Sequence, residues 1–375
     1  MNVLPAELLD CVIDEMQDDA SSLRACSLVC KAWLPRTSAH LFKSLSAHFS
    51  VETYDQPDPW KAPSFGFHAP IISSARVAAH VQVLRITICP STVADVAAIV
   101  VQLPQLRSLS VGGTLMTTAP SLPPPPSSGR HIGYLCVYQA CADVIPYFLS
   151  LFASVGTLEV HLCHVDDHFI PRTWPPLRHP VQHLHFWNIS GNVLRYLTSL
   201  LEPSALEGIN ASLNQTWDPI DLDDLSHLLR IAGSTIRSLE VQPDYRSFDT
   251  ISDLSSLQEC THLESITIEA SWSLLGNDWW RGFLAFLPFL PPATRVVRFV
   301  VSLTGGLARL PDIVMQNVDW GMIGSALERC SGLQRLQVGI RSVDTKPLSS
   351  PEYRGLREAI LVELPSRLQS IAVFD

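Results

Sequence analysis

A short apolar phrase recurs from residue 81 to the end of the chain and limits the possible folds more than any other feature. It consists of an apolar residue, two others, a second apolar residue, one other and a third apolar residue. The phrase occurs at Val81-Leu84-Ile86, Leu106-Leu109-Val111, Ile132-Leu135-Val137, Val155-Leu158-Val160, Val181-Leu184-Phe186, Leu206-Ile209-Ala211, Ile236-Leu239-Val241, Leu263-Ile266-Ile268, Val296-Phe299-Val301, Leu333-Leu336-Val338 and Leu368-Ile371-Val373. Successive first positions differ by 25, 26, 23, 26, 25, 30, 27, 33, 37 and 35 residues, so one structural unit is repeated along the chain.

Each phrase alternates with period two, as a strand with one buried face requires. Helix-like stretches separate the phrases, at 93–103, 141–153, 193–201, 222–231, 251–260, 278–287, 320–330 and 353–364. We therefore expect an α/β fold with a parallel sheet of about eleven strands and helices along its outer side. The early units fall within or near the length of about 20–29 residues typical of leucine-rich repeats, and the later ones are longer. Residues 81–375 thus resemble a degenerate leucine-rich-repeat solenoid, which implies an open horseshoe. A closed α/β barrel is the competing arrangement.

Three short helices are predicted within residues 1–48. Pro5 suits the first turn of a helix, and the polar break at Asp18 and Asp19, followed by Ser21 and Ser22, offers N-caps for the next. In the first helix, apolar residues at three- and four-residue steps predict one apolar face, made of Leu8, Leu9, Val12, Ile13 and Met16. In the second, an apolar stripe is predicted to continue to Trp33, made of Leu23, Cys26, Leu28, Val29 and Cys30. Pro35 marks a turn or a third helix.

The same segment carries the pattern Leu4-Pro5-x-Glu7-Leu8, then Ile13, then Leu23-x-x-Cys26-Ser27-Leu28-Val29-Cys30-Lys31-x-Trp33. This pattern resembles the F-box family signature over about 40 residues. The resemblance implies docking on a Skp-type adaptor protein through Leu4, Pro5, Leu8, Leu9, Ile13, Leu28, Val29 and Trp33. The acidic Asp18-Asp19-Ala20 link departs from the family, where many members have a proline. The alternative interpretation is a three-helix cap with no partner. Residues 49–80, rich in proline around residues 55–63, are predicted to link this module to the solenoid at 81–375.

In a solenoid of this type, the residues between the buried ones form three columns on the exposed strand face. In the unit that begins at Val296, Arg298 and Val300 are predicted to lie on that face. In the last unit, Ser370, Ala372 and Phe374 are predicted to lie there. Aromatic and polar side chains gather in the third to fifth units, at Tyr134, Tyr138, Glu159, His161, His183, His185 and Trp187. Aromatic rings with polar tips are enriched in binding hot spots, so we hypothesise that these residues contact a target protein. Stacking for stability is the alternative.

Composition excludes several classes of function. The net charge is −10 with no cluster of Lys and Arg, which argues against nucleic-acid binding. The nine cysteines form no CxxC pair, a pattern typical of free thiols in a reducing compartment. The sequence has no signal peptide and no apolar run of about 20 residues, so we expect a cytoplasmic or nuclear protein without membrane contact. The ligand-rich run 161–168 lacks standard zinc spacing, and the proline run 121–126 is interpreted as a repeat insertion. No metal or cofactor is expected, and no catalytic motif was found.

The resemblance to an F-box followed by leucine-rich repeats implies a substrate-recognition subunit of a cullin-based, SCF-type ubiquitin ligase. By resemblance, the N-terminal helices bind the Skp-type adaptor and through it a cullin, while the solenoid holds a target protein. Two alternatives remain. One is an F-box scaffold that works without a ligase, and the other is an enzyme built on an α/β barrel.

Overall fold

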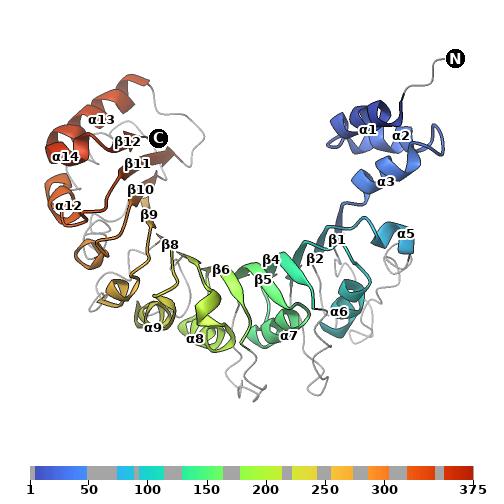
Figure 1. Cartoon of the computed structure of the whole chain (residues 1–375), viewed down its shortest axis with the longest axis horizontal. Coiled ribbons are helices and arrows are strands. Elements are labelled where there is room, and N and C mark those ends of the chain that lie inside the picture. Colours follow the sequence, from blue (N-terminus) through green and yellow to red (C-terminus); the bar gives the residue numbers. More distant parts are fainter. Residues whose placement is uncertain are drawn as a thin grey trace, which may run out of the picture. The chain divides into compact units, whose positions relative to one another are not determined.

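The computed structural model describes residues 5–48, 74–87, 93–113, 129–163, 178–212, 222–242, 255–272, 286–303, 319–342 and 350–374 (Figure 1). The chain divides into two compact units, Met1–Glu159 with Asp166–Pro171, and Val160–Val165 with Arg172–Asp375. Proline-rich 55–63, the polyproline run and residues 164–168 of the ligand-rich run lie outside the described residues, as does Leu4.

The first unit begins with three short helices and continues with strands that alternate with helical turns. Its helices are α1 (Ala6–Glu15), α2 (Ala20–Ser27), α3 (Leu34–Leu41), α5 (Ala75–Ala78), α6 (Val93–Val101), the 3-10 turn η2 (Ala142–Val144) and α7 (Ile145–Ser150). Its strands are β1 (Ser44–His48), β2 (Val83–Thr87), β3 (Ser108–Gly112) and β4 (His131–Tyr138), and β5 (Ser154–His161) holds the boundary between the units. Helices α6 and α7 lie on the same side of the strands (Figure 1).

The second unit repeats this alternation. Its strands are β6 (Val181–Trp187), β7 (Gly208–Ser212), β8 (Ser238–Gln242), β9 (Ser265–Trp272), β10 (Val296–Leu303), β11 (Arg335–Ser342) and β12 (Ala372–Phe374). Its helices are α8 (Gly191–Leu200), α9 (Leu222–Ala232), α12 (Trp320–Leu327), α13 (Ser350–Glu363) and α14 (Ser366–Gln369), with 3-10 turns η3 (Pro203–Ala205), η5 (Ser255–Glu259) and η6 (Leu287–Phe289). Of the predicted helix at 251–260, the described part forms only the short turn η5.

The strands form one parallel sheet in chain order from β1 to β12. Because β1 and β12 stand at opposite ends of that order, the sheet is open, and the competing barrel arrangement is wrong. About eleven strands were predicted, and the described residues contain twelve. The additional strand is β1, which pairs with β2 from Ser44 opposite Val83 to His48 opposite Thr87. It escaped the sequence analysis because Ser-Leu-Ser-Ala-His holds a single large apolar residue.

The apolar phrases face the core as predicted in most units. The second phrase position is fully or almost fully buried in β2 to β9, as at Leu84, Leu158 and Ile266. The first position, which precedes the strand in most units, is buried as well, as at Val81 and Leu263. The helices cover these side chains, so each unit completes its core against its neighbours.

The register predicted for β10 is wrong by two residues. Val297 pairs with Leu336 and Phe299 with Val338, so the phrase in this unit is Thr294-Val297-Phe299. Thr294 is fully buried at the first position, where other units have an apolar residue. A shift of two residues keeps the alternation of faces, because side chains alternate with period two. It does move Arg298 one column along the exposed face, opposite Gln337. Val300, predicted on the exposed face, is nevertheless almost fully buried.

The prediction for β12 is wrong by one residue, which reverses its two faces. Ala372 pairs with the core residue Leu336, and Val373 pairs with Gln337. Ala372 and Phe374, predicted on the exposed face, therefore follow the core-facing register. Val373, predicted in the core, is exposed. Leu368 is buried, but it belongs to helix α14.

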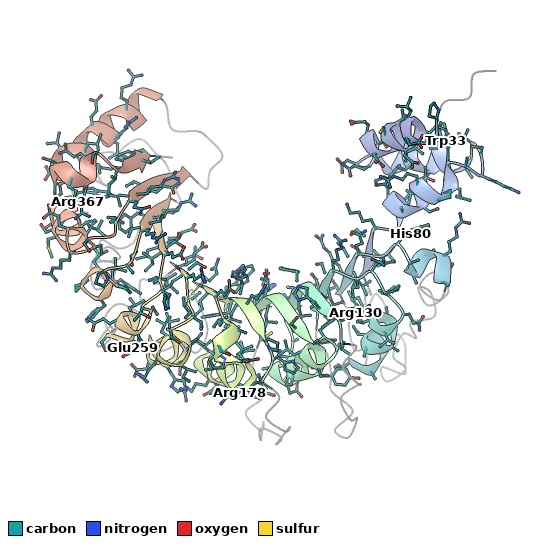
Figure 2. The ribbon with its side chains drawn as sticks, viewed as in Figure 1. Trp33, His80, Arg130, Arg178, Glu259 and Arg367 are labelled. Carbon is teal, nitrogen blue, oxygen red and sulfur yellow. The ribbon has the colours of Figure 1, made fainter. Side chains whose placement is uncertain are left out.

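Two arginines close helix ends, whose last carbonyl groups lack partners within the helix. Arg130 donates to the backbone oxygen of Leu103 at 2.5 Å and to that of Val100 at 3.3 Å, at the end of α6 (Figure 2). Arg367 donates to three backbone oxygens after α12, those of Glu328, Cys330 and Ser331 (Figure 2). In each case a side chain from a later repeat binds the end of an earlier helix.

Candidate functional site: exposed apolar helices and the strand face

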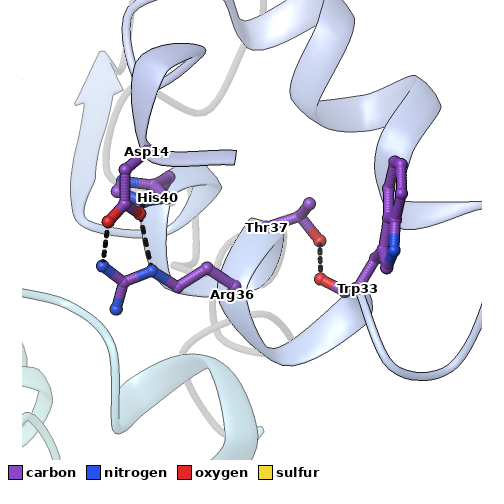
Figure 3. Close-up of polar contacts among 5 residues, drawn as sticks. All are labelled: Asp14, Trp33, Arg36, Thr37 and His40. Carbon is purple, nitrogen blue, oxygen red and sulfur yellow. Dashed lines mark hydrogen bonds and ion pairs between the residues drawn. The ribbon is translucent and has the colours of Figure 1, made fainter. Parts of the chain in front are cut away.

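The three N-terminal helices share a small core. Ile13 of α1 and Leu23 of α2 are almost fully buried, and Thr37 and Ser38 of α3 are buried beside them. The Thr37 hydroxyl donates to the backbone oxygen of Trp33 at 2.9 Å, which satisfies this polar group inside its own helix (Figure 3). So few buried side chains stabilise a module of this size only weakly.

Asp14 joins α1 to α3. The Arg36 guanidinium donates two hydrogen bonds to the Asp14 carboxylate, from Nε to Oδ1 at 2.6 Å and from Nη2 to Oδ2 (Figure 3). The His40 Nε2 lies 2.7 Å from Asp14 Oδ1. The hydrogen bonds from Arg36, and then the one with His40, lower the pKa of Asp14 to about 2. The carboxylate is therefore charged at neutral pH and holds the two helices together.

Helix α2 starts where the sequence analysis expected a cap. Asp19 accepts hydrogen bonds from the backbone N–H groups of Ser21 at 3.0 Å and Ser22 at 3.1 Å. The side-chain hydroxyls of both serines donate to the same carboxylate, and these bonds hold the pKa of Asp19 well below its ordinary value. The acidic link is therefore the N-cap of α2.

The second helix is shorter than predicted, and its apolar stripe is not continuous. Helix α2 ends at Ser27, so Leu28 and Val29 lie beyond it in a turn before α3. Within the predicted stripe only Leu23 is buried. The leucine and valine that follow the helix instead project to solvent.

The apolar residues of α1 also divide between two faces, contrary to the prediction of one. Ile13 is buried, and Leu9 is half-buried. Leu8 and Val12, one helical turn apart, are 51% and 52% exposed. The sequence analysis did not assign Val12 to the candidate site, although its four-residue spacing from Leu8 is visible in the sequence.

Four large apolar side chains are thus exposed on this module, namely Leu8, Val12, Leu28 and Val29, the last two at 85% and 62%. We call these four residues the apolar docking set. Of the predicted adaptor contacts, Pro5 is also exposed, Leu9 and Trp33 are half-buried, and Ile13 is core. Leu8 with Val12, and Leu28 with Val29, are therefore two exposed apolar pairs on a small module, which makes this module a candidate interaction surface.

The strand face of the first unit carries a tyrosine–carboxylate pair. The Tyr134 hydroxyl of β4 donates to Glu159 Oε2 of β5, and the Cys136 thiol approaches Glu159 Oε1 at 3.7 Å. Burial, and then the hydrogen bond to Glu159, raise the pKa of Tyr134 well above its ordinary value. The phenol therefore stays protonated, and it donates to the carboxylate.

Tyr138 of β4 reaches across the same face toward β2. Its hydroxyl lies 2.5 Å from the Thr87 hydroxyl, and its ring covers Gly112 of β3. A Cβ atom at Gly112 would lie 2.1 Å from the ring. The strand pairings place Thr87 opposite Gly112 and Gly112 opposite Tyr138, so the three residues share one column across the strands.

In the second unit, aromatic and imidazole rings lie over β6 and β7. His161 packs against Trp187 with ring centroids 4.8 Å apart and planes tilted by 41°. His183 covers Gly208, where an added Cβ would lie 2.5 Å from the imidazole Nδ1. His185 is half-buried in the next column, opposite Asn210. The predicted target-binding residues of this unit are thus half-exposed rings that already contact one another or the sheet.

No protein-family model matches the chain, and no curated protein is significantly similar to it. Among the described residues, no helix combines the length and apolar character that a membrane span requires.

Proposed function

We propose that this protein is the substrate-recognition subunit of an SCF-type ubiquitin ligase. In this proposal the N-terminal helices bind a Skp-type adaptor and the solenoid binds a target protein. The observation that carries it is the apolar docking set, which is exposed on the segment whose sequence resembles an F-box. The chain's own described residues do not cover these side chains, so a partner protein is the natural cover.

The docking set offers enough apolar surface to support such a contact. Full burial of one Leu or Val side chain is worth roughly 1.5–3 kcal/mol. Leu28 and Val29 project beyond the end of α2, and Leu8 and Val12 line one side of α1. The Asp14 contacts with Arg36 and His40 join α1 to α3 and favour one arrangement of the two helices before docking.

The ligase chemistry then requires no catalytic residue in this chain. Holding a target near a ubiquitin-charged enzyme raises the effective concentration of target lysines beside a thioester formed elsewhere. The strand face is the proposed target surface, with Tyr134, Tyr138 and Glu159 in the first unit and His161, His183, His185 and Trp187 in the second. These side chains are half-buried and partly fixed by the contacts described above, so binding them costs little side-chain entropy.

Adaptor binding is tested with the double variant Leu28→Asp/Val29→Asp. Charges placed at an apolar interface must be desolvated, so we expect adaptor affinity to fall by about 100-fold or more. The matched control is Val362→Asp on α13, which replaces a valine that is 78% exposed outside the module and should leave binding unchanged. Unchanged adaptor binding by the double variant, measured by calorimetry with purified adaptor, would contradict the proposal.

Ligase membership and target binding need separate measurements. Affinity capture with wild type should recover the adaptor and, through it, a cullin. The double variant should lose both proteins. Recovery of the adaptor without a cullin from wild type would favour the scaffold alternative. The variants Trp187→Ala and Tyr138→Ala should retain the adaptor but lose target proteins, as identified by mass spectrometry. An unchanged set of captured proteins would remove the strand-face hypothesis.

A further inference from the structure

Three side chains able to bind a metal ion meet on the neighbouring strands β4 and β5. Cys136 lies on β4, and Glu159 and His161 are two residues apart on β5, so these two project from the same face of their strand. The Cys136 sulfur, a Glu159 carboxylate oxygen and a His161 ring nitrogen all lie within 4.8 Å of one another. Cys136 comes from outside the ligand-rich run 161–168, so the spacing within that run did not indicate this cluster.

We infer that Cys136, Glu159 and His161 together bind one Zn²⁺ ion. A thiolate, an imidazole and a carboxylate are the three ligand types that zinc takes in proteins. Zn–S bonds of about 2.3 Å and Zn–N or Zn–O bonds of about 2.0–2.2 Å place the ligand atoms of a tetrahedral site about 3.3–3.6 Å apart. The Cys136 sulfur already lies 3.7 Å from Glu159 Oε1. The widest spacing in the cluster must therefore close by at most about 1.5 Å, which is within the reach of side-chain torsions.

Neighbouring side chains hold two of the three ligands. The Tyr134 hydroxyl donates to Glu159 Oε2, whereas Oε1 is the oxygen beside the Cys136 sulfur. One carboxylate oxygen is thus fixed by a hydrogen bond, and the other faces the thiol. The His161 ring packs against Trp187, with the ring centroids 4.8 Å apart. Hydrogen-bonded partners of this kind orient metal-binding carboxylates, and their loss typically lowers metal affinity by about 10–100-fold.

Metal binding changes the protonation of the cluster. Cys136 binds zinc as a thiolate, so its thiol proton passes to solvent as the Zn–S bond forms. The thiolate and the Glu159 carboxylate then balance the two positive charges of the ion. Three protein ligands leave the fourth tetrahedral position for a water molecule. Glu159 and His161 are only half-buried, so solvent has access to that position.

The first experiment is a calorimetric titration of zinc chloride into the full chain after treatment with a chelator. Wild type should bind one zinc ion with a dissociation constant of about 1 µM or lower. Cys136→Ser and Glu159→Gln, which nearly conserve side-chain size, should each lower the affinity by about 100-fold or more, and Tyr134→Phe by about 10–100-fold. The matched control is Cys141→Ser, which replaces a partly exposed thiol outside the cluster and should leave the affinity unchanged.

The second experiment replaces zinc by Co²⁺, whose absorption spectrum reports its ligands. Wild type should show the near-ultraviolet absorption of a thiolate bound to cobalt, and Cys136→Ser should lose it. Urea unfolding without metal establishes that each variant is folded. If Cys136→Ser does not fold, Glu159→Gln and the wild-type cobalt spectrum decide the question.

Two results would overturn the inference and leave a hydrogen-bonded cluster without metal. One is a wild-type cobalt spectrum that lacks the thiolate absorption. The other is a zinc affinity that stays the same in Cys136→Ser or Glu159→Gln as in wild type. The inference does not rest on the proposed function, because both measurements use the metal alone. Loss of adaptor binding and loss of zinc binding are therefore separate outcomes.

Discussion

The Tyr138 hydroxyl lies 2.5 Å from the Thr87 hydroxyl, two strands away, because Gly112 on the intervening strand leaves room for the ring. The contact therefore depends on the absence of a side chain at Gly112. We predict that Gly112→Ala pushes the ring aside and costs about 0.5–1.5 kcal/mol, the value of one hydrogen bond. In a Tyr138→Ala background the same change should cost almost nothing. Urea unfolding of the four proteins in this double-mutant cycle gives the free energy of each. If the costs of Gly112→Ala and Tyr138→Ala simply add, the arrangement is contradicted.

A second glycine of the same unit should be less tolerant. A Cβ at Gly156 of β5 would lie 2.7 Å from the backbone oxygen of Gly133 on β4. The obstacle here is backbone, which cannot swing away as the Tyr138 ring can. We predict that Gly156→Ala lowers the free energy of unfolding by about 1–3 kcal/mol, more than Gly112→Ala does. The check compares the unfolding midpoints of the two variants, and Gly156→Ala should have the lower one. A lower midpoint for Gly112→Ala would contradict the close approach of Gly156 to Gly133.

The repeated unit could be predicted from the sequence because in most strands the apolar residues alternate with other residues and so mark a single buried face. The prediction failed in two strands for different reasons. In β10 the error of two residues kept the alternation of faces, because the polar Thr294 hides the first phrase position and Val296-Phe299-Val301 fits the same pattern two residues further on. In β12, four consecutive apolar residues carry no alternation, so a one-residue slip went unnoticed. Pairing with the neighbouring strand, which no single strand encodes, decides the register.

The candidate docking surface was predictable in part. Helical spacing gave the apolar content of α1, but periodicity alone did not separate buried Ile13 from exposed Leu8 and Val12. That separation depends on where α3 packs, which the Asp14 contact with Arg36, 22 residues further on, helps to fix. The end of α2 at Ser27 was missed because Leu28 and Val29 continue the apolar pattern beyond the last helical residue.

Arg130 should contribute measurably to the stability of the first unit. It binds two carbonyl groups at the end of α6, and its charged group lies 6.0 Å from the Phe152 ring centroid. Burial lowers its pKa, yet it remains charged at neutral pH. We predict that Arg130→Met, which keeps an apolar stem, costs about 1–3 kcal/mol because two buried carbonyls lose hydrogen bonds from a charged donor.

The control for Arg130 is Arg237→Met. Arg237 lies 3.5 Å from Glu264, and both side chains are more than half exposed. Exposed ion pairs of this kind contribute about 0–1 kcal/mol, so the unfolding midpoint should hardly change. Equal effects of the two substitutions in guanidinium unfolding would contradict the role assigned to Arg130.

His179 should make the second unit sensitive to mild acid. Its side chain is buried, with 8% of the residue exposed, and Nε2 has no partner among the described residues. Burial lowers the pKa of His179 below its ordinary value of 6.5. Between the lowered value and 6.5 the unfolded chain binds a proton that the folded protein does not, so stability is complete above 6.5 and falls as the pH drops. The free energy of unfolding should fall by at most about 1.4 kcal/mol per pH unit for this single proton.

Urea unfolding at pH 7 and pH 5 tests this prediction. Between these pH values the free energy of unfolding should decrease less in His179→Leu than in wild type. The control His262→Gln, at an exposed histidine, should show the same decrease as wild type. A wild-type decrease that persists in His179→Leu would assign the acid sensitivity to other groups.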